Sequence, residues 1–378
     1  MRAEPRVPAD VLAKLRAPLS AGASSVDAPI LQPLGLLLDL AGEAMRARLF
    51  VVQAEGGQEA CLRPDFTVPV TRQHLESGSA SGRYYYEGKA FRASPDHADR
   101  AEEFVQIGLE RFDAAGATLL EADAEIASLA WKASVAGGRD DLMLWLGDIG
   151  LFAAFVDGLD LAPSLAARLK RAASRPRLLQ AELSRAGVEA KPVESSGLAD
   201  LLAGRSPDEA AVLLEEVWAL AGIEPVGGRG PVEIAQRLIR RAEAARAPAL
   251  SLDQAQSLGR FLRISDTPAK ALAAIRAIPG AKGELLSAAL ADWEERLALL
   301  TKAGVPEGAM LMATTLGHAF EYYDGLTFEV RSTALGADRP VAVGGRYDGL
   351  PARLNGPAGG RAVGCMVRPW RAFKGGEA

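Results

Sequence analysis

The pattern of secondary structure along this chain changes twice, and this alternation restricts the fold more than any other feature. Residues 1–160 and 304–378 contain short runs typical of strands, such as the alternating "FVQIGLERF". Residues 161–303 between them are rich in Ala, Leu, Arg and Glu at helical spacing, with breaks at Pro and Gly. We therefore predict an α+β fold in which one domain, built on an antiparallel sheet, is interrupted by a mainly helical insertion.

Composition argues against several classes of protein. The chain has 378 residues, two cysteines, three histidines and a net charge of −5. Two cysteines without metal-ligand spacing indicate neither a zinc site nor a disulfide framework, and an acidic chain lacks the overall charge of a nucleic-acid binder. No apolar run approaches the roughly 18 residues of a membrane span, and the N-terminus has no apolar signal-peptide core. We expect a cytoplasmic protein without a metal, a nucleic-acid partner or a membrane contact.

Strand geometry selects candidate ligand-binding side chains. In "FVQIGLERF", residues two apart point to the same face, so Gln106 and Glu110 share a polar face with Gly108, which leaves room above the sheet. In "LRPDFTVPV", Asp65 and Thr67 share a face if that stretch is extended. Carboxylates, an amide and a hydroxyl accept hydrogen bonds, which suits a small cationic or zwitterionic ligand. A solvated sheet face is the alternative reading of Gln106 and Glu110.

Two stretches near the end of the chain carry tyrosines beside glycines. "EYYDGLTFEV" contains Tyr322 and Tyr323, and "VAVGGRYDGL" contains Tyr347. Taken alone, the paired tyrosines indicate half-buried aromatics at a strand end. The glycine-rich stretch indicates a turn, because it matches neither phosphate-binding glycine motif. The three histidines form no nucleophile motif, so we expect no catalytic triad.

Together these segments resemble the class II aminoacyl-tRNA synthetases, and within them the histidyl-tRNA synthetases and their paralogues. The resemblance rests on "LRPDFTVPVTR", "YYYEGKAFR", "FVQIGLERF", "EYYDGLTFE", "VAVGGRYDGL" and "RAVGCMV", which follow the family's order. It covers most of the chain outside 161–303 and implies the synthetase-like antiparallel sheet flanked by helices, in a protein that self-associates as a dimer. It also implies a histidine-binding pocket formed by Asp65, Thr67, Gln106, Glu110, Tyr322, Tyr323 and Tyr347.

The chain departs from the active synthetases at the residues that handle ATP. His318 stands where the family has an arginine that contacts the reacting carboxylate and phosphate, and a histidine lacks that fixed charge. Ser94 stands where the family has a glutamate that reads the adenine ring. Arg92 and Arg371 match the arginines of the second and third motifs, and with Arg346 they are the candidate contacts for an anion or nucleotide.

The resemblance therefore implies a paralogue without catalytic residues or a cofactor. Few residues follow Arg371, so we expect no C-terminal anticodon-binding domain. Such a chain resembles the regulatory subunits of ATP phosphoribosyltransferase. These partner the short-form catalytic subunit in the first step of histidine biosynthesis, are needed for its activity and take part in feedback inhibition by histidine.

Two alternatives stay open at this point. One is a truncated histidine-activating enzyme in which Lys89, Arg92 or Arg346 supplies the missing positive charge. The other is a synthetase-like binding protein that serves a different partner.

Overall fold

The chain forms two compact units. The computed structural model describes residues 2–41, 43–53, 57, 59–95, 97, 99–173, 175–187, 206–221, 232, 234–236, 249–317 and 322–376. The first unit comprises Met1–Leu159 and Arg260–Ala378, and the second comprises Asp160–Gly259. The helix-rich range 161–303 is thus divided between both units, and its assignment as a single insertion stays a prediction.

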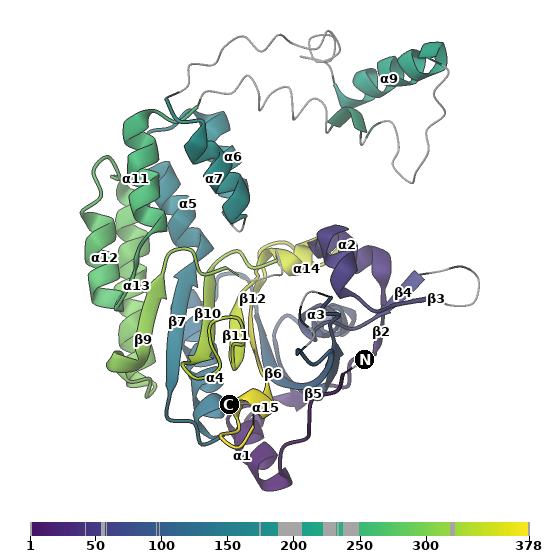
Figure 1. Cartoon of the computed structure of the whole chain (residues 1–378), viewed down its shortest axis with the longest axis vertical. Helices are drawn as coiled ribbons and strands as arrows, with labels where there is room; N and C mark the ends of the chain where they lie inside the picture. Colours follow the sequence, from purple (N-terminus) through teal and green to yellow (C-terminus); the bar gives the residue numbers. More distant parts are fainter. Residues whose placement is uncertain are drawn as a thin grey trace. The chain divides into compact units, whose positions relative to one another are not determined.

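A large sheet organises the first unit. Its strands are β1 (Ser24–Ser25), β5 (Gly82–Phe91), β6 (Glu103–Asp113), β7 (Leu142–Asp148), β8 (Ser265–Asp266), β9 (Met310–Ala313), β10 (Leu326–Ser332), β11 (Ala342–Arg346) and β12 (Arg361–Val367). The order across the sheet is β1-β5-β6-β12-β11-β10-β7-β9-β8. Figure 1 shows the part of this order from β5 to β9. Neighbouring strands run antiparallel, except that β1 is parallel to β5 and β7 is parallel to β9. This mostly antiparallel sheet confirms the predicted α+β class.

Helices of the first unit pack against the sheet and one another. They are α1 (Ala9–Ser20), α4 (Leu119–Val135), α5 (Ile149–Asp157), α12 (Pro268–Arg276) and α13 (Glu284–Lys302). Helix α4 contacts β10, β11 and β12, and both α1 and α13 pack against it. The strand-to-helix change after β7 has a local cause, because the Asp148 carboxylate accepts hydrogen bonds from the amides of Gly150 (2.7 Å) and Leu151 (3.2 Å) at the start of α5.

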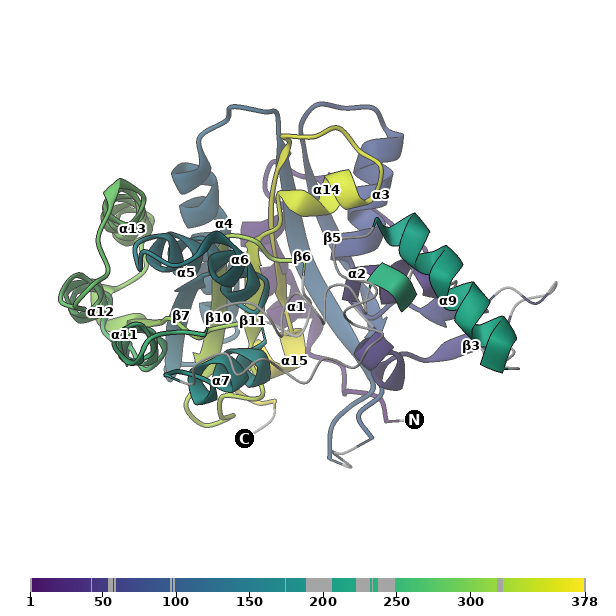
Figure 2. The ribbon, with the colours of Figure 1, turned by 90° about the horizontal axis from the view of Figure 1, so that it is seen from above.

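Smaller elements complete the first unit. They are α2 (Leu34–Ala41), the 3-10 helices η1 (Glu43–Arg48) and η2 (Glu307–Ala309), α3 (Thr67–Glu76), α14 (Gly349–Arg353), α15 (Pro369–Ala372), and a second sheet of β2 (Leu31–Pro33), β4 (Glu59–Leu62) and β3 (Val51–Gln53). Helix α14 lies beside α3 (Figure 2). Thr67 begins α3, so the condition under which Asp65 and Thr67 would share a face, an extended segment, is not met. "VGGRYDGL", for which a turn is predicted when it is taken alone, is the end of β11, a turn residue at Asp348 and the start of α14.

The second unit is helical in its described residues. It contains α6 (Pro163–Arg171), α7 (Pro176–Ser184), α9 (Pro207–Ala221) and most of α11 (Leu252–Leu262). The predicted helical segment "PVEIAQRLIRRAEAA" lies mostly outside the described residues. In neither unit does a described helix have both the length and the apolar character needed to cross a membrane.

Candidate functional site: a polar cavity on the large sheet

One row of residues across the sheet forms the floor of a cavity of about 250 Å³. Residues paired in register on neighbouring strands share a face, and here the row runs through Glu329, Val343, Met366, Gly108 and Tyr86. All of these except Gly108 line the cavity. The site is therefore assembled from five strands that are distant in sequence, and the sheet fixes their relative positions.

Neighbouring side chains fill the space that a Cβ would take at several glycines in this part of the sheet. A Cβ at Gly108 would overlap the end of the Tyr86 ring, so the room predicted above this glycine holds a tyrosine. In the adjacent row, a Cβ at Gly364 would overlap the Glu110 carboxylate, and one at Gly345 would lie 2.8 Å from the Tyr323 ring. These positions require glycine because larger neighbours lie across them, which explains why a glycine-rich stretch is part of a strand.

The structure brings the predicted acceptor side chains together. The Thr67 hydroxyl donates to Glu110 Oε1 at 2.8 Å, and the Tyr347 hydroxyl donates to Glu110 Oε2. The Tyr322 hydroxyl donates to Asp65 Oδ2 at 3.1 Å. The ring centroid of Tyr322 lies 4.7 Å from the ring centroid of Tyr323 and 5.9 Å from that of Tyr347, so the three tyrosines form one aromatic cluster.

Some of the predicted pocket residues line the cavity, and the others are buried in the protein without lining it. Asp65, Thr67, Tyr322 and Tyr323 line the cavity, whereas Gln106, Glu110 and Tyr347 do not and are at most 1% exposed. Within the part of the chain that the structure describes, three buried polar atoms of these residues have no hydrogen-bond partner: Oε1 and Nε2 of Gln106 and Oδ1 of Asp65. Buried polar atoms normally have partners, so unused hydrogen-bonding capacity at this place is consistent with a bound polar ligand.

Burial controls the ionisation of the two carboxyl groups. It raises the pKa of Glu110 to about 8, against the opposing effect of the hydrogen bonds from Tyr347 and Thr67. Burial also raises the pKa of Asp65, although the Arg92 guanidinium and the Tyr322 hydroxyl act in the opposite direction. At neutral pH Glu110 is therefore mainly a neutral carboxyl group, and a cationic ligand nearby would favour its ionised form.

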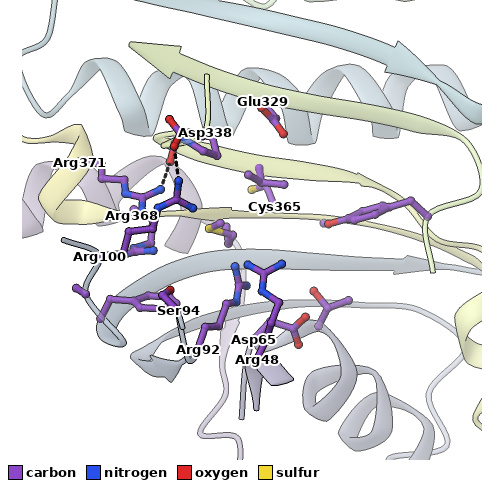
Figure 3. Close-up of a pocket in the computed structure, with 18 of the residues that line it drawn as sticks. Arg48, Asp65, Arg92, Ser94, Arg100, Glu329, Asp338, Cys365, Arg368 and Arg371 are labelled. Atoms are coloured by element: carbon purple, nitrogen blue, oxygen red, sulfur yellow. Dashed lines mark hydrogen bonds and ion pairs between the residues drawn. The ribbon is translucent and has the colours of Figure 1, made fainter. Parts of the chain in front are cut away.

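Arginines line the rest of the cavity (Figure 3). They are Arg48, Arg92, Arg100, Arg368 and Arg371. Arg92 Nε donates to the Pro64 carbonyl at 2.8 Å, and Arg371 donates to the Pro340 carbonyl at 3.0 Å. Burial, and then the charges of Arg92 and Arg100, lower the pKa of Arg48. This part of the cavity is suited to an anionic group.

Arg48, Arg100 and Arg368 were not predicted from the sequence. No motif marks Arg48 or Arg100, and only the neighbourhood of Arg371 could have pointed to Arg368. Ser94 also lines the cavity, whereas His318 lies outside the described residues.

Arg346 belongs to a different group of charges. It pairs with Asp123 at 2.6 Å and with Asp348 at 2.9 Å, and it is not among the residues that line the cavity. Asp123, fully buried on α4, also pairs with Arg296 of α13 at 3.0 Å. Lys89 pairs with Glu103 at 2.5 Å and likewise does not line the cavity.

Comparisons with known proteins place this architecture in a family. The model of the family described as histidyl-tRNA synthetase matches residues 11–225 and 233–368. The ATP phosphoribosyltransferase regulatory subunit of Brucella anthropi is 34% identical over 337 residues, which cover 87% of this chain and 86% of that protein. The protein of the same name from Brucella ovis is 35% identical over 334 residues, with the same coverage.

Solved structures of low identity share the fold. An ATP phosphoribosyltransferase regulatory subunit/histidyl-tRNA synthetase from Bacillus halodurans superposes with a TM-score of 0.63 at 20% identity, covering 98% of this chain and 79% of that one. A histidine–tRNA ligase subunit from Alicyclobacillus acidocaldarius gives a TM-score of 0.54 at 21% identity, covering 99% and 97%. The predicted class II synthetase-like sheet is thus confirmed. The chain belongs to the family of ATP phosphoribosyltransferase regulatory subunits, which has the histidyl-tRNA synthetase fold.

Proposed function

We propose that this chain is a non-catalytic subunit of ATP phosphoribosyltransferase in the first step of histidine biosynthesis. In this proposal it self-associates as a dimer in the cytoplasm, and the short-form catalytic subunit requires it for activity. The names of its relatives support this role. His318 and Ser94 stand at positions where related synthetases have an arginine and a glutamate that handle ATP, which supports the absence of histidine activation.

The proposed effector is histidine, bound in the cavity on the large sheet. The observation that carries this proposal is the Asp65 carboxylate, which lines the cavity, accepts from Tyr322 of the tyrosine cluster through Oδ2 and has no hydrogen-bond partner at Oδ1 among the described residues. Histidine presents an ammonium group and an imidazole N–H, which need acceptors, and a carboxylate, which needs a cation. Asp65 suits the ammonium group or the imidazole N–H, and Arg92 suits the carboxylate, because both residues line the same cavity. Gln106 and Glu110 are further proposed acceptors, although neither lines the cavity.

A reconstituted complex tests the role of the chain. Phosphoribosyl-ATP formation by a short-form catalytic subunit is measured with and without this chain, across a titration of histidine. Activation by the chain together with inhibition by histidine is the expected result. A catalytic subunit that works equally well alone would exclude the proposed role.

Variants test the histidine site within the same assay. Asp65→Asn removes a charged acceptor, and the loss of a charged hydrogen bond of about 1.5–3 kcal/mol predicts roughly 10- to 100-fold weaker histidine binding by calorimetry. Asp10→Asn, an exposed carboxylate on α1, serves as the matched control and should change nothing. Unchanged binding in Asp65→Asn would place the effector elsewhere, with the activation result still standing.

The arginine-lined part of the cavity could serve a second group of the ligand or a separate anion. Arg92 and Arg371 are the predicted contacts that line it, and Arg48, Arg100 and Arg368 extend it.

Histidine-dependent exchange of pyrophosphate into ATP distinguishes an active histidine-activating enzyme from the proposed regulatory subunit. We expect no exchange, and measurable exchange would favour the enzyme.

A further inference from the structure

Residues 2–4 pair with the start of β6. The carbonyl of Arg2 accepts hydrogen bonds from the amides of Glu102 at 2.8 Å and Glu103 at 3.0 Å, and the amide of Glu4 donates to the Glu103 carbonyl at 2.8 Å. A parallel β-bridge accompanies these bonds. Strand β12 pairs with β6 only further along, so residues 2–4 extend the sheet beyond the end of β12.

This pairing brings the Glu4 carboxylate to an arginine of the cavity. Glu4 Oε1 accepts from Arg368 Nη2 at 2.5 Å, and the side chains of Glu4 and Arg368 are 2% and 5% exposed. Arg368 Cζ lies 3.5 Å from the centroid of the Phe104 ring, so the ring packs against the guanidinium. Arg368 lines the cavity and Glu4 does not, so Glu4 neutralises Arg368 from outside the cavity.

Arg368 depends on this carboxylate. Burial, and then the charge of Arg371, lower the pKa of Arg368 to about 9, and the Glu4 carboxylate acts in the opposite direction. A buried charge that loses its partner is costly, because little water reaches it to replace the lost interaction. Arg368 therefore needs a negative charge beside it, and Glu4 provides that charge.

Arg368 also has hydrogen-bonding capacity left for a ligand. Its Nε is buried and has no hydrogen-bond partner among the described residues. Arg100 and Arg371 lie at the same end of the cavity (Figure 3), where Asp338 pairs with Arg100. An anion at this end would meet the Arg368 guanidinium from the cavity side, while Glu4 holds it from outside.

We propose that Glu4 and an anion in the cavity are alternative counter-ions of Arg368, so that Glu4 limits how tightly the cavity binds anions. While Glu4 is ionised, Arg368 adds little net charge to the cavity. This favours a ligand group with one negative charge, such as a carboxylate, over a polyphosphate. The limit holds whether or not histidine is the effector.

Binding of inorganic pyrophosphate measures this limit. Glu4→Gln keeps an oxygen that accepts from Arg368 and removes the negative charge. A unit charge several ångströms from an anion changes its affinity by roughly tenfold or more at an effective dielectric constant of about 20. We therefore expect pyrophosphate to bind roughly tenfold more tightly to Glu4→Gln than to the parent protein, by calorimetry at constant ionic strength. Glu294→Gln, which removes the carboxylate of an exposed ion pair with Arg276, is the control and should bind like the parent.

A double-mutant cycle separates this effect from a general loosening of residues 2–4. Arg368→Met removes the cation and keeps an apolar side chain against the Phe104 ring. Without Arg368, a buried Glu4 has lost its cation and becomes protonated, so its exchange for glutamine alters little charge. Adding Glu4→Gln to Arg368→Met should therefore change the affinity for pyrophosphate by less than about threefold.

Two results would overturn the exchange of counter-ions. One is a Glu4→Gln variant that binds pyrophosphate no more tightly than the parent, which includes no binding by either protein. The other is an equal gain in affinity with and without Arg368. If Glu4→Gln is unfolded when no anion is present, pyrophosphate should restore its cooperative thermal unfolding transition, and a variant that pyrophosphate does not refold would equally refute the idea.

Discussion

Glu110 allows a quantitative test of how burial acts on this site. Its pKa in the folded protein is about 8, against an ordinary value of 4.5. Because the folded value is the higher one, the stability that this group contributes is fully present below pH 4.5 and is lost as the pH rises through about 8. Between pH 5 and pH 8 the difference amounts to roughly 3 kcal/mol.

Glu110→Gln removes this titration and keeps a side chain of similar shape, whose amide oxygen can accept from one of Thr67 and Tyr347 while its NH2 group donates to the hydroxyl oxygen of the other. The free energy of unfolding of both proteins is measured by urea denaturation at about pH 5, 6, 7 and 8. All other titrating groups are common to both, so the wild type should lose about 3 kcal/mol more than the variant across this range. Parallel stability curves for the two proteins would show that Glu110 ionises normally and would refute the argument from burial.

Three other perturbations have defined outcomes. Gly364→Ala should lower the unfolding free energy by about 1–3 kcal/mol in denaturant, because the new methyl overlaps the Glu110 carboxylate, whereas Gly308→Ala, with open space around it, should have little effect. Asp123→Ala should lower it by about 3–5 kcal/mol by leaving Arg296 and Arg346 without their shared carboxylate, and a loss below about 1 kcal/mol would contradict this. Burial lowers the pKa of His74, so stability should fall as the pH drops below 6.5, and His74→Phe should show a shallower decline between pH 6.5 and 5.

Local periodicity was enough to predict the part of the site that lies on one strand. Gln106 and Glu110 lie on the same face of β6 because alternation has a period of two residues in any strand. The sequence could not show that Val343 and Met366 come to lie between this strand and Glu329. That arrangement depends on the order of strands across the sheet, which has no local signature.

Two local patterns differ from the fold for identifiable reasons. Asp65 and Thr67 would share a face only on an extended segment, which the β-branched residues of "FTVPVT" favour, yet Thr67 begins α3, where Pro69 is tolerated because the amides of the first turn have no partner within the helix. The glycines of "VGGRYDG" suggest a turn when only neighbours in sequence are considered. In the fold, Phe328 and Tyr323 lie across Gly344 and Gly345, so these glycines are needed by packing from other strands.

The position of β12 determines when the strands of the large sheet can all pair during synthesis of the chain. Residues 361–367 lie between β6 and β11, so the two halves of the sheet are joined only through a strand that leaves the ribosome after every other strand described here. Until then β5 and β6 have an unpaired edge, which is prone to pairing with other chains. The nascent protein therefore completes its central sheet late, and chaperones that shield strand edges would act on β6 for most of its synthesis.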